Sequence, residues 1–144
     1  MELVIIIIII TFLIGSISLA LPTKSAKKIS KLRMEASKIG CKVVSLSHSR
    51  IKFKKNDPTL ICYQIKNTTN LKDAHFIRDK SLFILYSPVK LKYSNEYENI
   101  NKSVQFFPDS IKEIIYSHST ISFLWKEFLG LDELKKIVNK IKLI

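Results

Sequence analysis

The sequence predicts an α+β fold: an N-terminal transmembrane helix and a basic juxtamembrane helix, then a small, mainly antiparallel β-sheet domain with a C-terminal helix packed on it. Three observations predict this fold. An uncharged apolar run fills residues 3–21, short segments rich in β-branched and aromatic residues follow residue 41, and apolar residues recur at helical spacing after residue 130. The predicted parts are a transmembrane anchor (1–22), a basic amphipathic helix (23–40) and a small α+β cytoplasmic domain (41–144).

The apolar run contains six consecutive isoleucines, at positions 5–10. As a helix with a rise of 1.5 Å per residue, the run is about 28 Å long, close to the hydrocarbon thickness of a bilayer. A cleaved secretory signal is the alternative, with Ser18, Leu19 and Ala20 as a weak cleavage site. We favour a retained anchor because no lysine or arginine precedes the run, and because the run is longer than the apolar core of a typical signal.

Basic residues follow the run, whereas only Glu2 precedes it as a charged residue. By the positive-inside rule, the N-terminus lies outside and the domain lies on the cytoplasmic side of the membrane. The anionic leaflet attracts basic side chains close to the anchor by about 1 kcal/mol each. The residues expected to contact this membrane surface are Lys24, Lys27, Lys28, Lys31 and Arg33.

Residues 24–39 are predicted to form a helix, because Ile29, Leu32, Ala36 and Ile39 recur at spacings of three and four. The glycine that follows, at position 40, suits the C′ position that ends a helix. The helix either lies on the membrane surface through its lysines or packs its apolar stripe on the domain. Both interpretations stay open, and they are compatible with each other.

Apolar segments, several of them alternating with polar residues, predict the strands of the domain. The predicted strands are residues 41–46, 51–54, 60–66, 82–86 and 89–93. We expect 82–86 to be a central strand because it is apolar on both faces. The polar residues 67–73 and 94–103 predict loops.

The end of the chain predicts a hairpin and a helix. Residues 111–116 and 121–125 fit either a hairpin or one helix, and their β-branched and aromatic content favours the hairpin. A helical stripe then follows at Leu131, Leu134, Ile137, Val138 and Ile141. Acidic residues in its first turn and lysines in its last turn match the helix dipole, and we expect this helix to cover one face of the sheet.

Nothing in the sequence indicates catalysis, a metal or a cofactor. Three histidines and two cysteines are scattered singly, without the paired spacing of metal ligands. With three glycines in the chain, a phosphate-cradling glycine-rich loop is excluded.

Cys41 and Cys62 are expected to be reduced, buried small hydrophobes. An enzyme remains the alternative class, because a nucleophile and its base meet in space rather than in sequence. It would need a pocket that holds at least two of His48, His75, His118, Cys41 and Cys62.

The formal net charge of +12 raises the question of nucleic acid. Lysines 52, 54, 90 and 92 on strand faces, with Tyr63, Tyr93 and Phe106 for stacking, would resemble an RNA-binding sheet. We do not expect nucleic acid as the partner, because Phe53, Tyr93 and Trp125 fall on the faces assigned inward and a stacking platform needs them outward.

Two resemblances bear on location. Residues 32–44, from Leu32 and Arg33 through Ala36 to Val44, with the strand through Tyr63 and residues 124–127, resemble small membrane-anchored gammaproteobacterial proteins of unknown function. The order of anchor, basic stretch and small β domain is also similar to the YajC family of preprotein translocase accessory subunits. That family's Gly-Asp-x-Val with a following Gly-Gly is absent, and residues 40–43 are the nearest match. The resemblances imply a membrane location.

We therefore expect a single-pass inner-membrane protein that acts as a non-enzymatic binding or accessory module at the cytoplasmic membrane face. Its partners would be the anionic lipid leaflet and a membrane protein, and its oligomeric state is left open. The alternatives are a membrane-tethered nucleic-acid-binding module and a YajC-like accessory subunit of protein translocation.

Overall fold

The computed structural model describes residues 2–46 and 53–144, with the side chains of residues 19 and 20 left out. The chain forms two compact units, Met1–Lys31 and Leu32–Ile144. The first unit contains helix α1 (Glu2–Ala20) and the start of helix α2 (Lys24–Lys38). The second contains the rest of α2 and a domain with a single β-sheet.

The predicted transmembrane helix and the location that depends on it are wrong. Within residues 2–46 and 53–144, the structure contains no helix of the length and apolarity that crossing a membrane requires. This finding overturns the transmembrane helix in the predicted fold, the single-pass topology and the inner-membrane location. The apolar run does form a helix, but α1 has 19 residues and begins with the charged Glu2. A membrane span takes about 20 predominantly apolar residues.

Helix α2 ends as the sequence predicts. Gly40 has a φ of +84°, the left-handed conformation that glycine adopts without steric cost. The Gly40 N–H donates to Ser37 O (3.1 Å) and the Cys41 N–H donates to Ala36 O (3.0 Å). This pair of hydrogen bonds is a Schellman motif, which satisfies the last carbonyls of the helix. Leu32 and Ala36 of α2 are buried in the domain core, so the stripe packs on the domain there.

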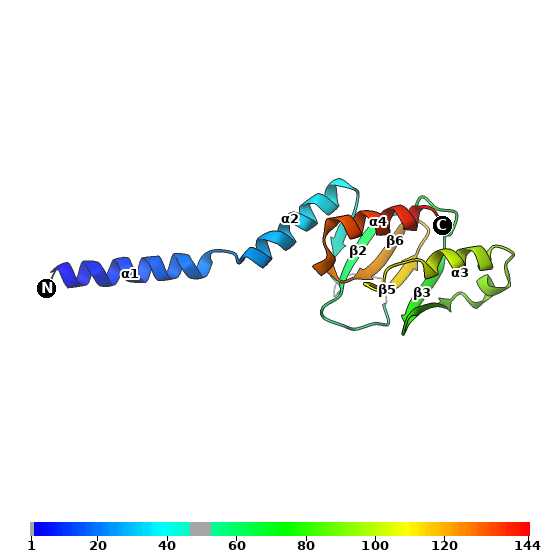
Figure 1. The fold of residues 1–144 in the computed structure, drawn as a ribbon, viewed down its shortest axis with the longest axis horizontal. Helices are drawn as coiled ribbons and strands as arrows, with labels where there is room; N and C mark the ends of the chain where they lie inside the picture. The colour runs from blue at the N-terminus through cyan, green and yellow to red at the C-terminus, as the bar shows by residue number, and fades with distance from the viewer. Residues whose placement is uncertain (1, 47–52) are drawn as a thin grey trace. The chain divides into compact units, whose positions relative to one another are not determined.

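The sheet is antiparallel, with six strands in the order β1-β2-β6-β5-β3-β4 (Figure 1). The strands are β1 (Lys42–Val44), β2 (Ile61–Lys66), β3 (Ala74–Asp79), β4 (Leu82–Ser87), β5 (Ile111–Tyr116) and β6 (Thr120–Trp125). The predicted α+β class and antiparallel sheet are therefore present in the domain. The predicted hairpin is present as β5 and β6, closed by a hydrogen bond from Ser117 N to Thr120 O (2.8 Å).

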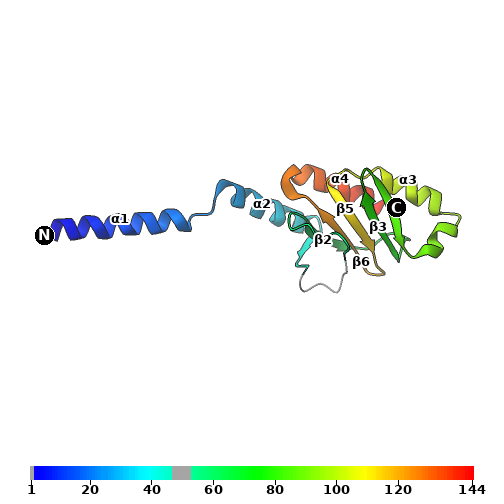
Figure 2. The same cartoon turned by 90° about the horizontal axis from the view of Figure 1, so that it is seen from below.

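Two helices cover one face of the sheet. Helices α3 (Tyr97–Gln105) and α4 (Leu131–Lys142) lie on the same side of it in both views (Figures 1 and 2). Helix α4 buries the residues of its predicted stripe from Leu134 to Ile141, and α3 buries Ile100 and Val104. They pack against large side chains of the central strands, among which Tyr63, Phe123 and Trp125 have no exposed surface.

Further predictions in the middle of the chain are corrected. Strand β3 has no counterpart among the predicted strands, and β4 is an edge strand rather than a central one. Residues 89–93 form a short 3₁₀ helix, η1 (Val89–Tyr93), because Pro88 has no N–H for a ladder and its carbonyl accepts from Leu91 N (3.1 Å). Helix α3 replaces most of the predicted loop 94–103. Of the predicted strand 51–54, residues 51 and 52 lie outside the described residues, and 53 and 54 are not in a strand.

Candidate binding face

The sheet face opposite the helices contains a buried carboxylate and, on β4, large exposed apolar side chains. Residues that pair directly across neighbouring strands project from the same face of a sheet. One such row runs across five strands from the centre to the edge: Cys62, Leu124, Glu113, Ile77 and Ile84. Side chains at one end of this row are covered by the chain itself, and those at the other end are open.

The covered end is a small second core. Cys62, Leu124 and Leu60 are buried together, with exposed fractions of 1%, 0% and 3%, and Val44 and Phe53 pack against them. Leu60 and Phe53 come from the connection between β1 and β2, so the chain lies over the sheet at this end. This cluster confirms that Cys62 is a buried small hydrophobe.

Glu113 holds this connection in place. Its carboxylate is fully buried and accepts hydrogen bonds from the backbone N–H groups of Lys54 (2.7 Å) and Lys55 (2.8 Å). His75 Nε2 of β3 lies 2.5 Å from Glu113 Oε1. A buried carboxylate is stable only when hydrogen bonds replace its hydration, and here three partners do so. Glu113 is the one acidic residue of β5, with isoleucines at positions 111, 114 and 115, and this is the sequence signal that could have marked the site.

Tyr86 of β4 continues the cluster towards solvent. The His75 and Tyr86 rings meet edge to face, with centroids 5.0 Å apart. The Lys54 ammonium lies 5.1 Å from the centroid of the Tyr86 ring, within the range of a cation–π contact. The tyrosine is thereby held in place from both sides while half of its surface stays exposed.

The open end consists of three large apolar side chains of β4, which we call the open strip: Leu82, Ile84 and Tyr86. Their exposed fractions are 61%, 49% and 51%, whereas Phe83 and Leu85, which point to the helices, are buried. Ile77 and Ile115 lie half-buried beside the strip. Natural edge strands are commonly protected by charged residues, and β4 has none. The open strip is therefore a candidate for contact with another molecule.

The free edge of β4 is partly closed. The Phe83 N–H donates to Gln105 Oε1 and Gln105 Nε2 donates to the Phe83 carbonyl, each at 2.8 Å. The amide of Gln105, at the end of α3, thus takes the place that a neighbouring strand would occupy. The strip is open on its face rather than along its edge.

The predicted membrane-contact residues do not belong to this face. Lys24, Lys27, Lys28 and Lys31 lie in the first unit and are exposed. Arg33 lies in the second and forms a bidentate pair with Glu127, with both N···O distances 2.8 Å. This pairing raises the pKa of Arg33 chiefly through the hydrogen bond to Glu127. Lipid contact by these five residues stays a prediction.

Tyr63 completes the Arg33 site. Its hydroxyl donates to Glu127 Oε1 (2.7 Å), and burial, assisted by that carboxylate, raises the pKa of Tyr63 strongly. Glu127 begins the short 3₁₀ helix η2 (Glu127–Leu129) and accepts from both residues. It thereby connects η2 to α2 through Arg33 and to β2 through Tyr63. The arrangement is a structural link within the second unit.

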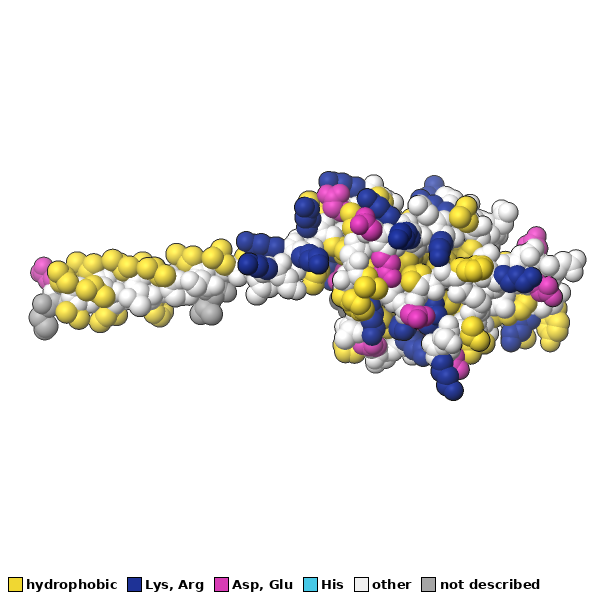
Figure 3. Space-filling model, in the orientation of Figure 1, with side chains coloured by type: hydrophobic (Ala, Val, Ile, Leu, Met, Phe, Trp, Pro, Cys, Tyr) yellow, Lys and Arg dark blue, Asp and Glu magenta, His cyan; other side chains and the backbone are white. Residues whose placement is uncertain are grey.

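The described residues of the predicted nucleic-acid platform do not form an exposed stacking face on the sheet; Lys52 lies outside the described residues. Tyr63 is fully buried and has no ring face for a base. Lys90 and Lys92 lie on η1 rather than on a strand, while Tyr93 and Phe106 are 84% and 72% exposed at helix ends. Figure 3 shows basic side chains spread over the visible face of the second unit with acidic ones between them.

The described cysteines and histidines form no common site of three or more ligands. Cys41 and Cys62 are free and buried, and burial raises their pKa values to about 11 and about 12. Within the part of the chain that the structure describes, no group of three or more histidine, cysteine or acidic side chains could hold a metal ion. His118 is exposed in the turn between β5 and β6. His48 lies outside the described residues.

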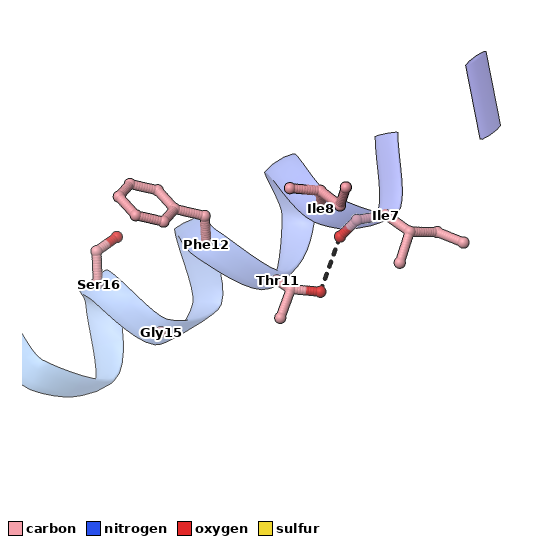
Figure 4. A pocket seen from close by; sticks show the side chains of 6 residues that line it. All are labelled: Ile7, Ile8, Thr11, Phe12, Gly15 and Ser16. Atoms are coloured by element: carbon pink, nitrogen blue, oxygen red, sulfur yellow. Dashed lines mark hydrogen bonds between the residues drawn. The ribbon is translucent and has the colours of Figure 1, made fainter. Parts of the chain in front are cut away.

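Helix α1 carries an apolar hollow. It is lined by Ile7, Ile8, Thr11, Phe12, Gly15 and Ser16, with a volume of about 590 Å³ (Figure 4). The Thr11 hydroxyl donates to the carbonyl of Ile7 (2.8 Å) and is not free for a ligand. All six lining residues belong to this one helix, so the hollow has no second wall that could enclose a ligand.

Comparison of the chain with protein-family models, with curated proteins and with solved structures found no match. The resemblances to small membrane-anchored gammaproteobacterial proteins and to the YajC family stay predictions.

Proposed function

We propose that this chain is a non-enzymatic binding module, and that its open strip binds an extended acidic and apolar segment of a partner protein. The exposure of Leu82, Ile84 and Tyr86 carries the proposal. These three side chains stand on one face of one strand, 49–61% exposed, in a domain whose other strands bury most of their large apolar side chains. Exposed apolar patches with polar rims mark interaction sites.

The geometry of the strip favours an extended partner. Alternate residues of a strand project from the same face about 7 Å apart, so the strip is about 14 Å long from Leu82 to Tyr86. A strand-like segment presents its own side chains at the same interval. Each apolar side chain of such a segment would meet one side chain of the strip.

The charges around the strip favour an acidic partner. The Lys54 ammonium lies over Tyr86 at one end. At the other end Lys80 lies in the turn that precedes Leu82, beside the exposed Asp79 that pairs with Leu82, so the ends of the strip carry two lysines and one carboxylate. Residues 32–144 hold 20 lysines and arginines against 11 aspartates and glutamates. Complementary charge at the rim of an interface raises the association rate and selects the partner.

A protein partner fits better than a nucleic acid. Proteins that bind single strands stack successive bases on aromatic rings, and Tyr86 is the one aromatic residue of the strip. Leu82 and Ile84 are aliphatic and suit the apolar side chains of a peptide. The edge of β4 is a weaker candidate than its face, because Gln105 already bonds with Phe83.

The test uses the full chain and fluorescent peptides of about eight residues, in which apolar residues alternate with aspartate and glutamate or, as the charge-reversed set, with lysine. Binding is measured by fluorescence anisotropy. We expect saturable binding of acidic peptides only, weakened about tenfold or more by Ile84→Asp, because the loss of an apolar contact of this size exceeds about 1.4 kcal/mol.

The matched control is Phe128→Asp, a substitution of an exposed apolar residue on η2. It should leave peptide binding unchanged. The proposal is refuted if no acidic peptide binds, if both substitutions weaken binding equally, or if a single-stranded oligonucleotide binds where the peptides do not.

A further inference from the structure

A second hollow lies where the β3–β4 turn approaches the connection between β1 and β2. It has a volume of about 420 Å³, and its polar lining includes Lys55, Lys80 and Lys112. The three lysines come from three different segments: the connection, the β3–β4 turn and strand β5. The hollow shares Lys80 with one end of the open strip, but none of Leu82, Ile84 and Tyr86 lines it, and the binding of an anion there does not depend on the function proposed for the strip.

The three lysines are not held in ion pairs with other described residues. Among the residues that the structure describes, none of the three forms an ion pair or a side-chain hydrogen bond. Each ammonium group is a compact charge with three donors. Three such charges in the lining of one hollow create a positive potential that an anion would relieve.

The other charged residues of the hollow are already engaged. Arg78 is 3% exposed and gives all its donors to the protein: its Nε and Nη groups bond with four backbone carbonyls and with Asp109 (2.9 Å). Asp57 accepts from the backbone and the hydroxyl of Thr59 (2.9 and 2.7 Å). These bonds, and then the nearby Lys126 and Lys112, lower the pKa of Asp57. The lysines therefore keep an excess of positive charge over the one carboxylate.

The backbone at Lys80 supplies an independent observation. Lys80 has a φ of +52°, in the left-handed region, and is the one residue other than glycine with a positive φ among residues 2–46 and 53–144. It opens a two-residue turn between Asp79 and Leu82, which pair with each other across β3 and β4. Glycine would occupy this conformation at no steric cost, whereas another residue costs about 1–2 kcal/mol. Strain of this kind gathers at functional sites.

We infer that this hollow binds a phosphate-class oxyanion through Lys55, Lys80 and Lys112. Lysine ammonium groups bind phosphate as point charges, and three of them match a multiply charged tetrahedral anion. The volume lies within the range of small-molecule sites, about 300–1,000 Å³, so it also admits a small group esterified to the phosphate.

Calorimetric titration of the full chain tests this inference with inorganic phosphate and with glycerol phosphate, at an ionic strength held constant with chloride. We expect saturable binding of at least one probe, and the tighter probe tells whether the anion is free or esterified. Lys80→Gly and Lys112→Gln should each weaken binding about tenfold or more, since each removes a charge-assisted contact of roughly 1.5–3 kcal/mol.

Lys80→Gly is informative because glycine relieves the strained φ. Its thermal unfolding midpoint should be at least that of the wild type, so that lost binding cannot reflect lost folding. Lys135→Ala, an exposed lysine of α4, is the matched control and should bind as the wild type does. The inference is overturned if neither probe binds saturably, if Lys80→Gly binds normally, or if Lys135→Ala weakens binding equally.

Discussion

Substitution of Glu113 by glutamine tests how the candidate face is held together. The substitution keeps the shape of the side chain and removes its charge. The wild-type carboxylate is fully buried and has three partners: the N–H groups of Lys54 and Lys55 and the imidazole of His75. Glutamine has one oxygen, so its amide group would face a donor that the carboxylate had satisfied.

The expected loss of stability follows from those contacts. A hydrogen bond to a charged group contributes roughly 1.5–3 kcal/mol, and a buried donor left without a partner costs about 1–3 kcal/mol more. One weakened hydrogen bond and one donor left without a partner together amount to about 3–5 kcal/mol. We therefore expect Glu113→Gln to lower the free energy of unfolding by about 3–5 kcal/mol. The loss should also release the connection at Lys54 and Lys55 from the sheet.

Urea unfolding followed by the fluorescence of Trp125, the one tryptophan of the sequence, measures the global effect. Hydrogen exchange measures the local effect, since the amides of Lys54 and Lys55 should lose protection before the strands do. The control is Glu133→Gln. Glu133 accepts from the neutral groups Ser110 Oγ (2.9 Å) and Trp125 Nε1 (3.1 Å), so its loss should be about 1 kcal/mol. Equal losses in the two variants, or unchanged protection in Glu113→Gln, would refute the reasoning.

Three further predictions concern stability. Burial raises the pKa of Cys41 to about 11 and of Cys62 to about 12, so the folded chain holds these protons more tightly than the unfolded chain does. Stability is then full below pH 9 and falls between pH 9 and about 12, which thermal melts across that range would show. Gly130→Ala should destabilise the chain more than Gly40→Ala does. The dihedral angles of Gly130, φ +85° and ψ −176°, are nearly exclusive to glycine, whereas Gly40→Ala should lower the free energy of unfolding by about 1 kcal/mol. Chemical unfolding of both variants checks the order. Among the described residues, Tyr116 has a buried hydroxyl without a hydrogen-bond partner. Tyr116→Phe should therefore raise the free energy of unfolding by about 1 kcal/mol and with it the melting temperature, and a lower melting temperature would contradict this.

Local signals predict the elements that depend on local chemistry. Gly40 marks the end of α2, and the spacing of apolar residues marks α4, because the physics of both lies within a few residues. Helix α3 escapes prediction although Tyr97, Ile100 and Val104 have helical spacing, since the polar residues between them resemble a loop. The structure shows that those three apolar residues suffice when a sheet lies beneath them.

The candidate face depends on long-range pairing, which the sequence does not reveal. Residues 82–86 are apolar on both faces, a pattern expected for a central strand, yet in β4 it reflects one covered face and one open face. Glu113 meets Lys54 and His75 across 59 and 38 positions of sequence. The three-residue cluster arises only when β3 and β5 pair in this register. Because the apolar pattern of residues 82–86 is typical of a central strand, the sequence predicts wrongly that the side chains of the open strip are buried.

Photo-crosslinking between the full chain and a bound acidic peptide is the most direct test of the central claim, that the open strip of β4 is the binding surface. The peptide carries a photoreactive residue at one of its apolar positions, and mass spectrometry locates the crosslinked residues. We predict crosslinks at Leu82, Ile84 or Tyr86, lost in Ile84→Asp and kept in Phe128→Asp. Crosslinks that gather instead on α3 or α4, on the covered side of the sheet, would contradict this claim.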